Sequence, residues 1–195
     1  MTFPPDFTYA AQKSLVARMA AQCIAGLAAG RGAVVQAGGC SGLWPLALAR
    51  HFEQVVTFEP EPTNFRYLKA NVSALPNVSA FDYALGETRA RVGLTRPKPK
   101  AGLWRVDGDG EIPMVTLDEF VGDLVVDAIV LDVEGLEVDA LRGAERLIDT
   151  HRPLLWFEFL HNAPEIEAFL AAHGYTPPAR GLGSDCYSIH ASRVH

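Results

Sequence analysis

Basic residues are scarce in this chain of 195 residues, which has 17 Lys and Arg against 23 Asp and Glu and a formal net charge of −6. Apart from one small cluster, formed by Arg96, Lys98, Lys100 and Arg105, the basic residues are spread along the sequence. A protein that binds duplex nucleic acid usually presents a basic face. The composition therefore argues against a nucleic-acid partner and favours a small molecule or a glycan.

The sequence also lacks cysteine pairs and long apolar runs. Its three cysteines, Cys23, Cys40 and Cys186, are far apart and form no CxxC pair, so neither a disulfide framework nor a zinc site is indicated. No apolar run reaches the roughly 18 residues of a membrane span. The first residues show no basic segment followed by a continuous apolar one. We therefore expect a cytoplasmic protein without a membrane partner, and the sequence does not indicate its oligomeric state.

What the sequence does have is an alternation of short β-branched runs with amphipathic segments. Strands are expected in "GAVVQA", "QVVTFE", "VSAFDYAL", "DAIVLDVE", "PLLWFEFL" and "SDCYSIHAS", and helices at 9–29, 43–51, 62–75, 135–150 and 163–174, with a short helix opening in "TLDEFV". Strands separated by helices predict an α/β fold with a parallel sheet covered on both faces. We expect one domain over 1–195, with an N-terminal helix within 1–30. Its apolar stripe contains Leu15, Met19, Cys23 and Leu27, with Val16, Ala20 and Ile24 alongside.

The stretch "VVQAGGCSGLWPLALAR", residues 34–50, joins the first expected strand to the next helix through Gly38, Gly39 and Gly42. In an open parallel sheet, ligands bind beyond the carboxyl ends of the strands, where a glycine turn lets the backbone approach a cofactor. The spacing is not the dinucleotide fingerprint GxGxxG. However, Glu59 ends the second strand 21 positions after Gly38, where an acidic residue commonly binds the ribose hydroxyls of a cofactor. The alternatives are a purely structural turn, with Ser41 as a helix cap, and a solvated Glu59.

Several motifs together resemble one known family. They are "VVQAGGCSGLWPLALA", "VVTFEPEPTNFRYLKANV", "ALGE", "VTLDEFV", "AIVLDVEGLEVDALRGAERLI" and "RPLLWFEF", in this order from Ala33 to Phe159. They are similar to the FkbM-type methyltransferases, enzymes dependent on S-adenosylmethionine (SAM) with the class I, Rossmann-like fold and its mostly parallel seven-stranded sheet. The resemblance implies that Gly38, Gly39 and Gly42 form the cofactor loop, that Glu59 holds the ribose, and that Asp82 lies near the adenine. It also implies that Asp132 and Glu134 face the region of methyl transfer, with Asp132 contacting the cofactor.

Two residues depart from the family pattern. The family usually has Asp at the position of Gln36 and Asn at the position of Cys40. Gln36 can still hydrogen-bond to the cofactor but cannot neutralise its ammonium group as a carboxylate would, so reduced affinity for SAM is one expectation. Cys40 is expected to be a small buried apolar residue rather than a reactive thiol.

Methyl transfer to a hydroxyl requires an oriented acceptor and a base that takes its proton. Asp132 follows "AIVL" and Glu158 follows "LLWF", so both carboxyls leave apolar strands, where desolvation could raise a pKa. Glu134 is the first candidate for base or acceptor binding, with helix capping as the alternative; Glu59 and His161 are further candidates for the base. Asp132, Glu158 and His161 could instead hold Mg²⁺, although no spacing in the sequence requires a metal.

The segment 87–113 is expected to bind the acceptor, because Trp104 lies there among several cations; an ordinary solvated loop is the alternative. The leading prediction is a SAM-dependent O-methyltransferase acting on a hydroxyl of a small molecule or sugar. One alternative is a nicotinamide-dependent oxidoreductase, for which the true fingerprint and a hydride site are missing. Another is a non-catalytic module of methyltransferase type, suggested by Gln36 and Cys40. A nucleic-acid N-methyltransferase is disfavoured, because "DVEG" replaces an NPPY-type tetrapeptide.

Overall fold

The computed structural model describes residues 1–4, 7, 10–96, 104–159 and 162–194. Seven strands of this part of the chain form the central sheet: β1 (Ala33–Ala37), β2 (Gln54–Phe58), β3 (Val78–Phe81), β9 (Ala128–Leu131), β10 (Leu154–Glu158), β11 (Ala179–Arg180) and β12 (Asp185–Ser188). Their order is β11-β12-β10-β9-β1-β2-β3. The pairs from β3 to β10 are parallel, and β12 runs antiparallel to both β10 and β11. The predicted α/β fold with a mostly parallel seven-stranded sheet is confirmed.

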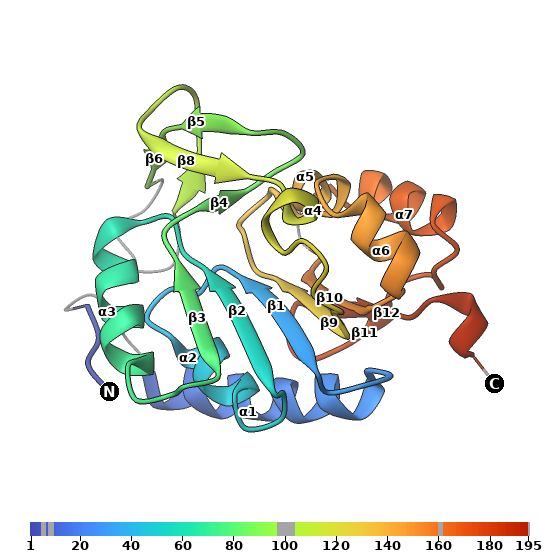
Figure 1. The fold of residues 1–195 in the computed structure, drawn as a ribbon, viewed down its shortest axis with the longest axis horizontal. Coiled ribbons are helices and arrows are strands. Elements are labelled where there is room, and N and C mark those ends of the chain that lie inside the picture. The colour runs from blue at the N-terminus through green and yellow to red at the C-terminus, as the bar shows by residue number, and fades with distance from the viewer. Residues whose placement is uncertain (5–6, 8–9, 97–103, 160–161, 195) are drawn as a thin grey trace.

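Helices cover both faces of the sheet (Figure 1). On one face, α1 (Ala10–Leu27) and α2 (Leu43–Leu48) bury Val34 and Val130, and α3 (Pro62–Val72) lies beside α2 and β3. On the other face, α5 (Glu137–Arg142), α6 (Glu145–His151) and α7 (Ala163–Ala172) bury Val35 and Ile129. Neighbouring strand residues point to opposite faces, so each apolar strand contributes to two cores.

The N-terminal helix forms as predicted, but its predicted buried stripe is only partly confirmed: Ala20 and Ile24 are buried, whereas its large residues Leu15 and Met19 are not. Leu15 and Met19 are 51% and 49% exposed, and Cys23 is exposed as well. The buried residues of α1 are Ala17, Ala20, Ala21, Ile24 and Ala25. Four of these five are alanines, whose small side chains let the helix approach the sheet closely. The pattern of apolar residues therefore identified the helix, but it centred the buried face on large residues instead of on the alanines.

Two predicted elements are each divided in the structure. The strand expected over 78–85 consists of β3 and of β4 (Ala84–Leu85), which belongs to a different sheet. The helix expected over 135–150 is interrupted between α5 and α6 at Gly143. A Cβ atom on Gly143 would lie 2.0 Å from the carbonyl oxygen of Gly86, so the glycine allows these two turns to touch. The break in the helix is thus associated with a contact to a segment far away in the sequence.

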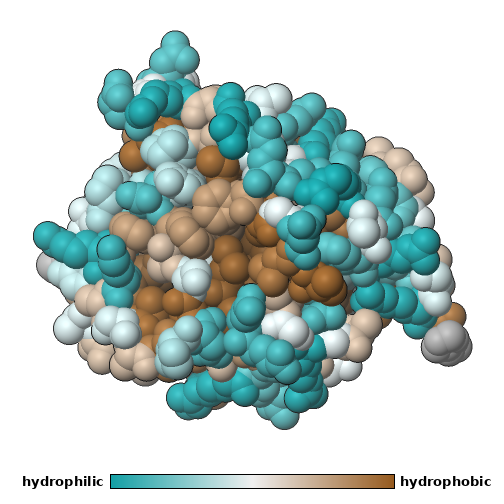
Figure 2. Space-filling view, in the orientation of Figure 1, coloured by the Kyte–Doolittle hydropathy of each residue, from teal (hydrophilic) through white to brown (hydrophobic). Residues whose placement is uncertain are grey.

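The segment between β4 and the short helix α4 (Leu117–Phe120) builds two small sheets above the carboxyl ends of the central strands (Figure 1). In one, β8 (Ile112–Val115) lies between β4 and β5 (Ala90–Val92); in the other, β6 (Leu94–Thr95) pairs with β7 (Arg105–Val106). Figure 2 shows apolar side chains gathered in the middle of the same view, below the small sheets. Among the described residues, no helix is long and apolar enough to cross a membrane.

Candidate functional site

A cavity of about 560 Å³ lies at the carboxyl ends of the central strands. Its walls come from the loops after β1, β2, β9 and β10, from α1, and from the small sheets through Leu94, Trp104 and Val106. The turn before β12 closes one side. The volume is within the range of small-molecule sites, and the position is where an open α/β sheet binds its ligands.

The glycine loop after β1 is shaped by contacts within the protein itself. The amides of Gly38 and Gly39 both donate to the carbonyl of Phe58, at 3.0 and 2.9 Å. Gly38 has φ 83°, and a Cβ there would lie 1.8 Å from the backbone oxygen of Asp132. Gly42 has φ 97° and is the N-cap of α2 in place of the expected Ser41. The glycines are thus needed to pack the loop, and Gly38 and Gly39 also line the cavity.

Glu59 holds this loop from the end of β2. Its Oε2 accepts a hydrogen bond from the amide of Cys40 at 2.6 Å, and its Oε1 accepts one from the amide of Glu61 at 2.9 Å. The residue is 5% exposed, so it is not the solvated strand end of the alternative reading. Burial raises the pKa of Glu59 to about 7, although both backbone amides oppose the shift. Glu59 lines the cavity, where its remaining lone pairs can accept further hydrogen bonds.

Two other predicted cofactor residues lie away from the cavity wall. Gln36 is completely buried; its Oε1 accepts from Thr57 Oγ1 at 2.6 Å, and its Nε2 donates to the carbonyl of Ala37 at 2.8 Å. Its amide therefore braces β1 against β2 from inside the sheet. Asp82 is exposed, and the neighbouring Tyr83 lines the cavity instead.

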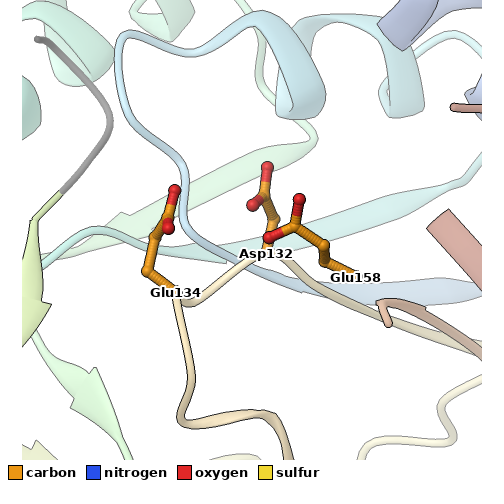
Figure 3. A group of neighbouring side chains, drawn as sticks. All are labelled: Asp132, Glu134 and Glu158. Carbon is orange, nitrogen blue, oxygen red and sulfur yellow. The ribbon is translucent and has the colours of Figure 1, made fainter. Parts of the chain in front are cut away.

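Three carboxylates meet on the cavity floor. Asp132 and Glu134 follow β9, Glu158 ends β10, and each contributes an oxygen lying within 4.8 Å of the others. Figure 3 shows the three side chains projecting to the same side of the strand ends. Burial raises the pKa of Asp132 to about 7, and Glu158, Asp185 and Glu134 add to the shift by charge repulsion. Convergence of neighbouring strand ends, as the sequence predicted, brings these residues together.

The turn after β9 is fixed by a residue that the sequence reasoning missed. Glu137, completely buried in the first turn of α5, accepts hydrogen bonds from the amides of Val133 and Gly135. Glu134 has φ 54°, which lets it leave the turn toward the cavity. The N-cap of α5 is Leu136 and no side chain caps the helix, so Glu134 does not have the capping role of the alternative. The signal of Glu137 in the sequence was an acidic residue two positions after Gly135, at the start of an apolar helix.

The turn before β12 supplies two further polar residues that were not predicted. Ser184 donates from Oγ to Glu158 Oε1 at 3.0 Å. Asp185 pairs in register with Glu158 and accepts from Trp156 Nε1 at 2.9 Å. Burial raises the pKa of Asp185, and Glu158 adds to the shift. The antiparallel pairing of β12 with β10 places both residues at the cavity. The sequence alone does not show this pairing or its register.

The carboxylates can do two kinds of chemistry. Close, desolvated carboxyls hold protons more tightly than usual, which suits a base acting near neutral pH. Oxygen ligands of this kind also suit Mg²⁺, and two of the three residues suggested for Mg²⁺ from the sequence, Asp132 and Glu158, are in the group. The third, His161, lies outside the described residues.

Protonation of Glu59 and Asp132 should make the protein more stable at mildly acidic pH. Both have a pKa of about 7 when folded, against about 4 when unfolded. The folded state therefore binds protons more tightly, and stability is gained as pH falls through 7. Between pH 8 and 6.5 we expect a gain of roughly 1.5 kcal/mol and about 4 °C in Tm, measured calorimetrically with EDTA present. Asp132→Asn should remove about half of the gain; a Tm that falls over this range would contradict the raised pKa values.

Trp104, which lines the cavity beside the small sheets, is in contact with a basic residue. The guanidinium of Arg96 lies 5.4 Å from the ring centre of Trp104, a cation–π distance. A second, smaller cavity of about 260 Å³ adjoins the first and shares Val106, Glu134 and Leu136 with it; Arg105 and Asn162 also line it. Lys98 and Lys100, predicted parts of the same cluster, lie outside the described residues.

The glycine loop and the carboxylates fall within a known family model. The model, described as the methyltransferase FkbM domain, matches residues 36–177. A curated relative, Methyltransferase 1 of Beauveria bassiana (strain ARSEF 2860), is 28% identical over 155 residues, which are 63% of this chain and 61% of that protein.

Solved structures share the fold. A methyltransferase FkbM from Methylobacillus flagellatus KT has a TM-score of 0.60 and 20% identity, over 81% of this chain and 43% of that one. A protein from Streptococcus mutans, solved in complex with SAH, has a TM-score of 0.52 and 8% identity, over 87% of this chain and 93% of that one. The chain thus spans 61% of the length of the curated relative and 43% of the Methylobacillus protein.

Proposed function

The chain belongs to the FkbM methyltransferase domain family, whose model covers residues 36–177, and from this premise we propose that it transfers a methyl group from SAM to a hydroxyl of a small molecule or sugar. The observation that carries the proposal is the meeting of two groups in one cavity. One is the glycine loop held by Glu59, and the other is the trio of carboxylates at the ends of β9 and β10. The loop with Glu59 suits binding of a nucleoside, and the carboxylates suit removal of a proton from the acceptor.

The cavity residues fit SAM. Glu59 has lone pairs left for the two ribose hydroxyls after its bonds to Cys40 and Glu61. Phe58, Tyr83 and Leu85 provide apolar surface on the same side for the adenine. Ser41 adds a completely buried hydroxyl that has no hydrogen-bond partner within the described protein and lines the same cavity. Bound SAM would supply an electrophilic methyl group.

Asp132 is the base in this proposal, and Glu134 binds the acceptor. A carboxyl with a pKa of about 7 is half ionised at neutral pH and binds a proton strongly enough to take one from a polarised hydroxyl. Glu134 lines both cavities, so it lies between the cofactor region and the smaller cavity. Trp104 lines the cavity and offers an aromatic face on which a sugar ring or a flat group can pack.

The competing functions have less support. A nicotinamide-dependent oxidoreductase would need the GxGxxG fingerprint and a hydride site, and the family membership also argues against it. A non-catalytic module was suggested by Gln36, but the Gln36 amide is bonded to Thr57 and Ala37 inside the sheet. Its lack of charge therefore removes no group from the cavity wall.

Calorimetric titration with SAH tests the cofactor, with NADH as the control ligand. We expect micromolar binding of SAH and none of NADH. An acceptor panel of sugars, phenols and other hydroxyl compounds, assayed for SAH release from SAM, then tests the reaction. If the protein binds neither SAH nor SAM, or binds NADH instead, the proposal fails. If it binds SAH but methylates only amines, O-methylation is wrong and methyl transfer stands.

A further inference from the structure

One basic side chain reaches the cavity. Lys13, in the first turns of α1, is the only Lys or Arg among the described residues that line it. Its Nζ lies 5.2 Å from the ring centre of Phe7, which also lines the cavity. Its positive charge affects the pKa of two groups in the cavity. Burial raises the pKa of the Cys40 thiol to about 12 and that of Asp132 to about 7, and Lys13 opposes both shifts. Lys13 thus faces the glycine loop as well as the carboxylates.

Ser41 is next to Cys40 in the same loop. It is 0% exposed, and its Oγ is the one buried side-chain oxygen or nitrogen of the described residues without a hydrogen-bond partner. Its backbone carbonyl accepts from Asn71 Nδ2 at 2.8 Å, so the residue is held in place from outside the cavity. The hydroxyl lowers the pKa of the Cys40 thiol, against the larger effects of burial and Glu59, but a thiol is a weak hydrogen-bonding group. A buried hydroxyl that lacks a partner costs free energy, which a ligand can recover.

Together the two residues favour one chemical class of ligand. A lysine and a hydroxyl can both donate hydrogen bonds, and the lysine adds a positive charge, so the pair suits a carboxylate. Asp132, Glu134 and Glu158 line the same cavity and repel an anion, so a carboxylate is favoured at Lys13 and Ser41 rather than beside these three residues. Glu59 accepts the amide of Cys40, the neighbour of Ser41, so a cofactor whose ribose binds Glu59 lies close to Ser41.

We propose that Lys13 and Ser41 bind the carboxylate of the amino-acid part of SAM, with Lys13 neutralising its charge and Ser41 donating a hydrogen bond from Oγ. This inference rests on the proposed function. It makes the N-terminal helix part of the cofactor site, and it gives the one lysine of the described cavity wall a role distinct from that of the carboxylates.

Two ligands separate this role from a general effect on the cavity. SAH contains the amino-acid carboxylate, whereas 5′-methylthioadenosine has the same nucleoside and sulfur without the amino acid. In calorimetric titrations, Lys13→Met should weaken SAH binding about 10- to 100-fold and leave the affinity for methylthioadenosine within about twofold. Ser41→Ala should weaken SAH binding about fivefold and likewise spare methylthioadenosine. Lys13→Arg, which keeps the charge, should restore most of the SAH affinity.

Arg18→Met is the matched control, because Arg18 is an exposed cation of the same helix that does not line the cavity. It should bind SAH as the wild type does, and the Tm of every variant should confirm that it is folded. If Lys13→Met weakens both ligands equally, or neither, the inference is overturned while SAM binding stands. If the wild-type protein binds neither SAH nor methylthioadenosine, the proposed function fails and the inference fails with it.

Discussion

Glu59→Ala should abolish measurable binding of SAH, with a Kd at least about 100-fold above that of the wild type. The carboxylate is expected to accept both ribose hydroxyls, and it already accepts the amides of Cys40 and Glu61. Alanine removes the ligand's acceptors and also releases the loop on which the cofactor lies. Since hydrogen bonds to a charged group contribute about 1.5–3 kcal/mol each, loss of two accounts for the expected change. Calorimetric titration with SAH measures it.

Two variants keep this experiment interpretable. Glu59→Gln preserves the shape of the side chain, but its NH₂ group cannot accept a bond from Cys40 or Glu61, so SAH binding should also fall by about tenfold or more. Asp82→Ala removes an exposed carboxylate at the end of the adjacent strand, outside the cavity wall, and should bind SAH normally. If Glu59→Gln folds with an unchanged Tm and binds SAH as tightly as the wild type does, Glu59 is excluded as the ribose ligand.

The position of the glycine loop and of Glu59 could be predicted because both depend on order along the chain. A buried strand, a glycine turn and an acidic end of the next strand follow each other within 26 residues, from Val34 to Glu59. The same local logic located Asp132 and Glu158, because parallel strands end at a common edge. In each case the residue follows directly after a strand, and the fold class alone places the ends of these strands at one edge of the sheet.

Other features depend on contacts that no local pattern encodes. The buried face of α1 follows from alanines that let the helix approach closely, so ranking positions by hydrophobicity selected Leu15 and Met19, which are exposed. Gln36 has the sequence position of a cofactor ligand, yet its amide is bonded to Thr57 on the neighbouring strand. Asp185 reaches the cavity through its antiparallel register with Glu158. These residues illustrate that a motif position predicts where a backbone lies more reliably than where a side chain points.

In the proposed site, Lys13 and the three carboxylates line one cavity and act on different groups of its ligands. SAM has positive charges at its sulfonium and ammonium groups and a negative charge at its carboxylate. Lys13 complements the carboxylate, and Asp132, Glu134 and Glu158 can complement the positive groups. Ionised Asp132 is unfavourable in the ligand-free protein, because burial and repulsion by neighbouring carboxylates raise its pKa. The raised pKa makes Asp132 a stronger proton acceptor than an exposed carboxylate, and this is the property that a base requires.

Asp132→Asn should lower kcat by about 10²- to 10⁴-fold and change the Kd for SAH by no more than a few-fold, when assayed with a hydroxyl acceptor identified by the panel. The amide has nearly the same shape as the carboxylate but cannot take a proton. In the wild type, kcat should rise with pH through about 7, because Asp132 must lose its proton before it can act as a base. The variant should lack this rise.

Glu134→Gln is the matched comparison, since Glu134 belongs to the same carboxylate group and lines both cavities. If Glu134 binds the acceptor, its substitution should raise KM for the acceptor more than it lowers kcat, and the dependence of kcat on pH should persist. The opposite pattern, with the pH dependence lost in Glu134→Gln and kept in Asp132→Asn, would assign the base to Glu134. A kcat that is independent of pH between 5.5 and 8.5 in the wild type would exclude Asp132 as a base with a pKa of about 7, because its ionised fraction changes most over that range.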